Sequence, residues 1–496
     1  MKLIYQVEDK PKFGQLIVFA LQQLLAIMTA TLVVPVIING NVAGAIARGE
    51  VAWEMTETMS PAAALFGAGI GTLVYLFFTM RKSPVFLGSS FAFLGSMTSA
   101  FVGASTMALG YLGLIIGAVL AGLVYVIIAI IVKFCGAKWI DKVMPAVVIG
   151  PTVAIIGLSL AGNAVGDLTS GIAGTETTPG TDPKIALLCG LVTLATVMFA
   201  SVYGKKIGKL IPFIFGICAG YIFALIISHC GYMLGIPEMY IIPDTAFDGF
   251  LVNGEVTFKS FISVPDMTFL SAKGAFSEFS GTYFLTVLVA YAPVAFVVFA
   301  EHIADHKNIS SIIERDLLEK PGLHRTLLGD GVGSMVGAFF GGCPNTTYGE
   351  SIGCVAITKN ASVVSIFAAA IGAIIISFVN PFIVFVNSIP SCVMGGVCMA
   401  LYGFIAVSGL KMIQKVDLNK NKNLFVVSVI LIAGVGGLAV DFNTANGKIT
   451  ITEVACALIL GILTNLMMKG SKEDDEVEAV AAPAEAPAEE KKAEEQ

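Results

Sequence analysis

The longest apolar runs in this chain continue without a charge for about the distance that a bilayer requires. Residues 112–132 contain no charged side chain, and a helix of about 20 mainly apolar residues spans a membrane. Strands of a membrane β-barrel would instead alternate polar and apolar residues. Charged residues make up 13% of the chain, against about 25% in a typical soluble domain. The sequence therefore predicts an all-α polytopic membrane protein and excludes an ordinary soluble enzyme.

Hydropathy divides the chain into fourteen candidate transmembrane spans. The predicted spans are 13–38, 60–80, 84–105, 110–134, 143–163, 185–204, 208–232, 282–304, 325–341, 344–358, 362–386, 389–410, 423–440 and 449–469. The third and tenth are short, and small polar residues interrupt them. We count both as crossing the membrane because the distribution of basic residues requires it.

Lysine and arginine residues test this topology, because cytoplasmic loops of membrane proteins carry an excess of both. With the N-terminus inside, 24 of the 29 basic residues fall on the cytoplasmic side and 5 fall outside. One miscounted span in the middle of the chain would destroy this asymmetry. We therefore expect a multi-pass protein of the cell membrane with both termini in the cytoplasm.

Segments outside the spans have distinct compositions. Residues 473–496 hold ten acidic and two basic residues, more than the whole net charge of −6, and predict a disordered solvated tail. Residues 233–281 are predicted to form an ordered external loop between two halves. Residues 305–324 carry apolar residues at helical spacing among charges, which predicts a short amphipathic helix along the membrane surface.

Local patterns recur about half a chain apart and indicate an internal repeat. The matched pairs are Ser89-Ser90-Phe91 with Thr346-Thr347-Tyr348, Pro35 with Pro293, and Pro145 with Pro390. They relate spans 1, 3 and 5 to spans 8, 10 and 12. The shift is seven spans, an odd number, so the second half is inverted in the membrane. Inverted repeats with broken helices at corresponding positions are typical of transporters that bind their substrate near the midplane.

A few acidic residues fall within or at the ends of apolar spans. An acid at the bilayer centre costs on the order of 3 kcal/mol, so each is a candidate for function. Glu350 follows the break in span 10, just inside the second half-helix. Glu301 and Asp305 are four residues apart and share one face of a helix. Asp330 is interpreted as a structural acid near a helix end.

Motifs for metal binding or catalysis are missing from the sequence. His302 and His306 are four residues apart, but Glu301 precedes the first of them, so the HExxH zinc motif is absent. The nine cysteines form no CxxC pair, and neither a Walker loop nor a dinucleotide fingerprint occurs. We expect no metal, no cofactor, no enzymatic activity and no ATP-driven transport.

Five motifs in this chain resemble the nucleobase–ascorbate transporter family, also called nucleobase:cation symporters. The motifs are PVFLGSSFAFLGS, FVVFAEHIADH, PGLHRTLLGDG, FFGGCPNTTYGESIG and IPSCVMGGVCMALYGFIAVSG. They are most similar to the bacterial uracil permease branch, and the likeness extends over roughly residues 10–470. NTTYGE is the most specific of them, because the purine-transporting branches tend to differ there.

The resemblance implies a fold of two inverted seven-span repeats. Spans 1–4 and 8–11 would form a core domain, and spans 5–7 and 12–14 a gate domain. The implied divisions are a cytoplasmic N-terminus (1–12), the first half of the core (13–134), the first half of the gate (135–232), the external loop (233–281), the second half of the core (282–386), the second half of the gate (387–470) and the acidic tail (471–496).

The resemblance also implies a substrate site between spans 3, 8 and 10. Carried over by motif, the implied substrate-binding residues are the carboxylates Glu301 and Glu350, the backbone of Phe91 and Gly349, and the apolar walls Ala30, Phe91 and Tyr348. Glu301 and Asp305 would couple transport to a proton. Some relatives carry His where this chain has Asp305, and Gln22-Gln23 stands where Gln-His is frequent, so the coupling step differs in detail.

The implied function is proton-coupled uracil import by alternating movement of core against gate. Carboxylates suit uracil because its ring presents two N–H donors and two carbonyl acceptors. The partners would be a small nucleobase and the lipid bilayer, with no nucleic acid, and a homodimer is expected. A xanthine or purine symporter of the same family is the first alternative. An anion carrier of the same fold is weaker, because the acids would repel anions, and a membrane-embedded enzyme or receptor lacks its motifs.

Overall fold

The computed structural model describes residues 3–136, 139, 144–174, 179–251, 254–444 and 447–468. Within these ranges, eight helices are long and apolar enough to cross a membrane. They are α1 (Phe13–Ala47), α2 (Pro61–Phe78), α4 (Met107–Cys135), the continuous pair α6 (Ala146–Ser159) and α7 (Ala161–Leu168), α8 (Pro183–Tyr203), α10 (Pro212–Leu234), α12 (Gly281–Ile313) and α17 (Ser391–Ile413). The structure is therefore the helical membrane protein that the apolar runs predict.

The other predicted spans contain α13 (Leu323–Gly341), which is as long as α2 but is not among the eight, and shorter helices. The shorter helices are α15 (Val363–Ile376) with α16 (Asn380–Asn387), α18 (Asn421–Val435) and α19 (Glu453–Met467). The end of span 13 and the start of span 14 were predicted as helix, but β3 (Val440–Thr444) and β4 (Gly447–Ile451) pair there as antiparallel strands. The count of fourteen crossings stays a prediction.

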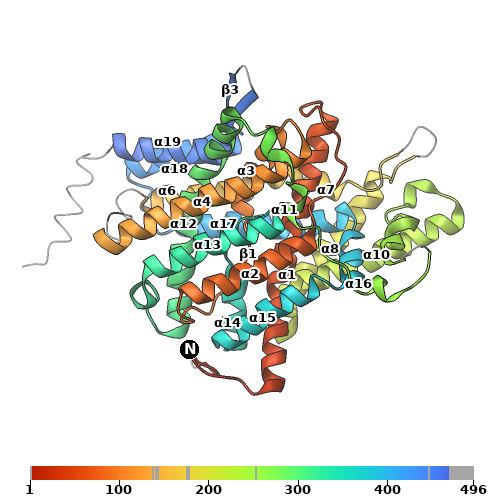
Figure 1. Ribbon diagram of the computed structural model, residues 1–496, viewed down its shortest axis with the longest axis horizontal. Coiled ribbons are helices and arrows are strands. Elements are labelled where there is room, and N and C mark those ends of the chain that lie inside the picture. The colour runs from red at the N-terminus through yellow and green to blue at the C-terminus, as the bar shows by residue number, and fades with distance from the viewer. Residues whose placement is uncertain are drawn as a thin grey trace, which may run out of the picture.

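Two predicted spans are broken at corresponding places. Span 3 consists of the strand β1 (Leu87–Ser89), the 3₁₀ turn η1 (Phe91–Phe93) and the helix α3 (Leu94–Val102). Span 10 consists of β2 (Asn345–Thr347) and α14 (Gly349–Thr358). The strands pair antiparallel with Gly88 opposite Thr346, and they lie in the middle of the molecule (Figure 1).

Features matched by the sequence repeat occupy equivalent structural positions. Pro35 lies inside the 35-residue α1, and Pro293 lies inside the 33-residue α12. Pro145 and Pro390 are the N-cap residues of α6 and α17. The two broken spans meet as one antiparallel strand pair, which is the arrangement expected of inverted halves. The predicted class of fold is confirmed.

Helix packing falls into two groups. In the first, α13 packs on α2 and α4, α15 packs on α1 and α2, and α12 packs on α3 and α4. In the second, α17 packs on α6, α7 and α8, α10 packs on α8, and α18 packs on α6 and α19. Smaller contacts join them, such as those of α12 with α6 and α19. The first group contains helices assigned to the core domain, and the second contains helices assigned to the gate domain. Movement of one domain against the other stays a prediction.

Three connecting segments can be compared with expectation. The external loop contains short ordered turns: η2 (Pro237–Met239), η3 (Asp244–Phe250), η4 (Phe258–Ser260), α11 (Thr268–Ser271) and η5 (Ala275–Ser277). The surface helix predicted over 305–324 is wrong, because α12 continues to Ile313 and buries His306, Ile309 and Ile313 before the turn η6 (Leu318–Gly322). The predicted disordered tail lies outside the described residues.

Glycines allow α2 and α13 to approach closely. Gly67 and Gly71 lie on α2, and Gly333, Gly337 and Gly341 lie on α13, each four residues from the next. A Cβ atom on Gly67 would lie 2.3 Å from the Gly337 carbonyl oxygen. Small residues spaced in this way let helix backbones pack directly in a membrane, where van der Waals contact drives association.

We predict that Gly67→Ala destabilises the protein by about 1–3 kcal/mol, because the added methyl forces two backbones apart. Thermal unfolding in detergent would show a lower midpoint than that of the wild type. Gly162→Ala is the matched control, since its Cβ would meet no atom within 4 Å. Equal midpoints for both variants would contradict the role of this helix contact.

Candidate functional site

A cavity of about 420 Å³ lies where the two groups of helices meet. The first group contributes residues from α1, η1, α12, β2 and α14, and the second contributes residues from α6, α9 (Lys206–Leu210), α10 and α17. Its walls are mainly apolar, but three carboxyl groups line it: Glu301, Asp305 and Glu350. This combination of apolar walls with a few polar groups is typical of a small-molecule site.

The two acids of α12 occupy successive turns of one helix face. Glu301 and Asp305 both line the cavity, as their spacing of four residues predicts. Thr347 Oγ1 donates a hydrogen bond of 2.8 Å to Asp305 Oδ2. Because Thr347 is the last residue of β2, this bond joins the broken span to the acid on α12.

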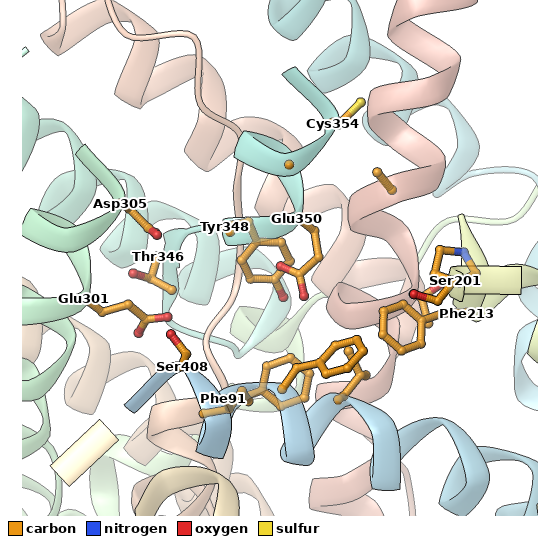
Figure 2. A pocket seen from close by; sticks show the side chains of 18 of the residues that line it. Phe91, Ser201, Phe213, Glu301, Asp305, Thr346, Tyr348, Glu350, Cys354 and Ser408 are labelled. Atoms are coloured by element: carbon orange, nitrogen blue, oxygen red, sulfur yellow. The ribbon is translucent and has the colours of Figure 1, made fainter. Parts of the chain in front are cut away.

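Glu350 enters the cavity from the first turn of α14. A helix N-terminus carries partial positive charge and stabilises an acid placed there. The N-cap residue, Tyr348, makes no side-chain capping hydrogen bond, and the Glu350 carboxylate accepts a hydrogen bond from its own backbone N–H. Gly349 also lines the cavity, and a Cβ on it would meet no atom within 4 Å. Figure 2 shows the carboxylates of Glu301 and Glu350 pointing into the space beside Phe91.

Two aromatic residues flank the acids. The Tyr348 hydroxyl donates a 2.5 Å hydrogen bond to the Ser89 carbonyl, so its ring is held across the strand pair. A Cβ on Gly88 would lie 2.4 Å from that ring, so only glycine fits beneath it. Phe91 begins η1 and makes an edge contact with Tyr402 of α17, with centroids 6.2 Å apart.

The predicted residues are brought together with one difference. Phe91, Tyr348, Gly349, Glu301, Asp305 and Glu350 all line the cavity. Ala30 is buried, with 2% of its surface exposed, but it is not among the described residues that line the cavity. Its neighbour Thr29 is, together with Ala26 one turn earlier. Adjacent helix positions differ by about 100° in direction, so a match by motif does not select between them.

A second cavity of about 730 Å³ lies on the other side of Phe91. It is more polar and includes Arg48, Asp167 and Glu453. Phe91, Ala92 and Ile156 line both cavities and therefore separate them.

The second cavity also includes Asn41 and Asn163. Asn163 Nδ2 of α7 donates a 2.9 Å hydrogen bond to Asn41 Oδ1 of α1, which joins the two groups of helices there.

The buried histidines take part in hydrogen bonds behind the site. His302 Nδ1 is 2.6 Å from Asp330 Oδ2, and both side chains are almost fully buried. His306 Nδ1 lies 2.8 Å from the His302 carbonyl, which can only accept, so this nitrogen carries the proton. The other ring nitrogen of His306 is 2.7 Å from the Tyr75 hydroxyl. No group of three or more potential metal ligands occurs among the described residues.

Comparison with known proteins identifies the family. The model of the Permease family matches residues 14–442. The uracil permease of Bacillus caldolyticus is 35% identical over 474 residues, which cover 95% of each chain. The uracil permease of Escherichia coli strain K12 is 34% identical and covers 93% of each. The putative pyrimidine permease RutG of that strain is 27% identical and covers 93% of this chain and 91% of its own.

This chain belongs to the Permease family, the nucleobase–ascorbate transporters that its motifs resemble. It is a nucleobase transporter of the cell membrane with several spans, not an enzyme.

Solved structures share the fold at low identity. Murine Slc26a9, an anion transporter in the inward-facing state, superposes with a TM-score of 0.58 at 12% identity, covering 93% of this chain and 69% of its own. The transmembrane domain of the cyanobacterial bicarbonate transporter BicA gives a TM-score of 0.52 at 11% identity, covering 93% and 100%. At these identities the likeness shows the architecture alone.

Ser351 supports the site from behind, and its replacement tests that support. Phe86 N–H donates a 2.9 Å hydrogen bond to Ser351 Oγ, and Gln23 Nε2 donates to the same oxygen. Ser351→Ala leaves the buried Phe86 N–H without this acceptor, so we expect a loss of about 1–3 kcal/mol in stability. Thermal unfolding in detergent measures it. Gln23→Leu should cost less, because Phe86 keeps its acceptor, and the reverse order would contradict this interpretation.

Proposed function

We propose that this protein imports uracil across the cell membrane by proton symport. The observation that carries the proposal is that Glu301 on α12 and the first turn of α14, with Gly349 and Glu350, line one cavity. Relatives at 34–35% identity over nearly the whole chain bear the name uracil permease. The proposal adds the specific substrate and the coupling ion to the nucleobase class.

The chemistry of the cavity matches the edges of uracil. The ring has two N–H groups, which the carboxylates of Glu301 and Glu350 can accept, because ionised carboxylates are acceptors only. It also has two carbonyl oxygens, which the backbone N–H groups at Gly349 and Phe91 can reach as donors. Phe91 and Tyr348 offer flat apolar surfaces for the ring faces. Because the Tyr348 hydroxyl is bonded to Ser89, this residue contributes its ring.

Alternating access would follow from movement of the first group of helices against the second. Lys209 lines the 420 Å³ cavity and is one of the 24 basic residues assigned to the cytoplasm, so we propose that this cavity opens inward and that both termini are cytoplasmic. Phe91, Ala92 and Ile156 would then form the barrier between this cavity and the second, 730 Å³ cavity on the outer side. The bond between Asn41 and Asn163 would hold the outer side closed. We also propose a homodimer, as the family resemblance implies.

Coupling to protons follows from crowding of acidic groups. Three ionised carboxylates around one cavity would repel each other in surroundings of low dielectric. A proton bound at Asp305 or Glu301 relieves that repulsion when a neutral substrate enters. The same three acids oppose an anionic substrate, so the anion-carrier alternative gains nothing from the shared fold. A xanthine or purine symporter is the alternative that competition must exclude.

The decisive experiment is uptake of labelled uracil by purified protein in liposomes with an imposed pH gradient. We expect accumulation that unlabelled uracil blocks and that xanthine and adenine leave largely unchanged. Failure to take up uracil, or inhibition only by purines, would overturn the proposed substrate.

Glu350→Gln is expected to weaken uracil binding at least tenfold. The amide replaces a charged acceptor with a neutral group that also carries donors, and hydrogen bonds to charged groups contribute about 1.5–3 kcal/mol. Calorimetric or scintillation-proximity binding measures the loss. Glu255→Gln, in the external loop, should bind like the wild type. Wild-type affinity in Glu350→Gln would refute the proposed contact.

Asp305→Asn is expected to separate binding from coupling. The side chain keeps its size and can still accept from Thr347 Oγ1, but it can no longer exchange a proton. Uracil affinity should stay within a few-fold of the wild type, while the pH gradient no longer drives accumulation. Asp266→Asn in the external loop serves as the control. An unchanged response to the gradient would assign the coupling to another residue.

A further inference from the structure

Behind strand β2 lies another, much smaller space. It has a volume of about 10 Å³ and is lined by residues of α4, α12, α13, η1 and β2. Its polar lining comes from Tyr125 on α4, Asp330 and Ser334 on α13, and Asn345 at the start of β2. None of these residues lines the substrate cavity. The space is therefore separate from the site of transport.

Three oxygen atoms on residues that line this space have no hydrogen-bond partner among the described residues. They are the Tyr125 hydroxyl, Asp330 Oδ1 and Asn345 Oδ1. The side chains that carry them are at most 3% exposed. Buried polar atoms in native proteins are nearly always hydrogen-bonded to protein or to ordered water. Three unpartnered atoms on residues that line one small space therefore indicate a common missing partner.

The other polar side-chain atoms of Asp330 and Asn345 are already engaged. Asp330 Oδ2 lies 2.6 Å from His302 Nδ1. Asn345 Nδ2 donates a 3.2 Å hydrogen bond to the Gly67 carbonyl, which assigns the other atom of the amide as the acceptor Oδ1. The atoms left over are thus two acceptors and one hydroxyl that needs an acceptor.

We propose that this space binds one water molecule that bridges Tyr125, Asp330 and Asn345. Water has two donors for Asp330 Oδ1 and Asn345 Oδ1, and an acceptor for the Tyr125 hydroxyl. A space of roughly 10–15 Å³ accommodates one water, which typically makes about three such bonds. A sodium ion is a poorer match, because the Tyr125 hydroxyl would keep a proton with no acceptor.

The water joins strand β2 to Asp330, the buried acid of α13. Asn345 is the first residue of β2, and the residues that follow it include Thr347, bonded to Asp305, and Tyr348, at the start of α14. Through the water, the His302–Asp330 pair and Tyr125 are linked to that strand. Tyr125, Asp330 and Asn345 therefore act as positioning residues for the site. The water site itself stands on the geometry, whereas its effect on uracil affinity depends on the proposed function.

The test compares two buried tyrosines. Tyr125→Phe removes one of the three bonds to the water, whereas Tyr291→Phe removes a buried hydroxyl that also lacks a partner but lines none of these spaces. A structure of the full-length protein that resolves ordered water should show density at about 2.7–3.2 Å from all three oxygens. In Tyr125→Phe we expect the density to weaken and the KM for uracil to rise about five- to tenfold with little change in maximal rate. Tyr291→Phe should change neither.

The outcomes separate the two proposals. Absence of this density from the wild-type structure would overturn the bridging water. An unchanged KM for uracil in Tyr125→Phe would overturn its positioning role. If the unfolding temperature rises with sodium chloride but not with choline chloride, a cation occupies the space in place of water, and the proposal is overturned. If the water is present but the wild type takes up no uracil, the proposed substrate fails while the water site stands.

Discussion

Backbone groups that leave a helix inside a membrane must find partners within the protein, and this requirement governs the centre of the molecule. Each unsatisfied group costs several kcal/mol in hydrocarbon. The two broken spans meet this requirement by pairing with each other, Leu87 to Ser89 against Asn345 to Thr347. Thr72 adds a further bond by accepting from the Leu87 N–H at 2.9 Å. The breaks are therefore stable only as a pair.

That pair determines where the chemistry lies. Because β2 ends at Thr347, α14 begins at Gly349, and its N-terminus lies beside the strands. Glu350 follows at once, and Thr347 reaches Asp305 on α12. The acids are thus held by elements that are fixed against each other. The other wall comes from helices of the second group, α6, α10 and α17.

Much of the architecture could be predicted because it depends on composition and periodicity. Apolar runs located the eight long apolar helices, and the segments Gly88-Ser89-Ser90 and Pro344-Asn345-Thr346-Thr347 marked the breaks. The spacing of Glu301 and Asp305 placed both on one face, and the cavity confirms that they are close. The segment 305–324 was misassigned, because amphipathic spacing does not tell a helix that faces protein from one that faces lipid headgroups.

Other parts of the site depend on how each helix is rotated by its neighbours. Thr29 rather than Ala30 faces the cavity, and neither residue type nor spacing distinguishes them. The His302–Asp330 pair joins residues 28 positions apart on different helices. Asp330 was expected to be structural, but nothing in the sequence pointed to its partner. The bond from Thr347 to Asp305 likewise exists only after the strands have paired.

The antiparallel strand pair also imposes an order on synthesis. Gly88 has its partner at Thr346, so the first strand emerges from the ribosome roughly 260 residues before the second. At about 5–20 residues per second, the first half waits on the order of ten to fifty seconds with an unpaired strand. During that time, its polar backbone needs water, lipid headgroups or the insertion machinery. Membrane insertion of the early helices can thus precede the completion of the fold, and the final step belongs to the second half of the chain.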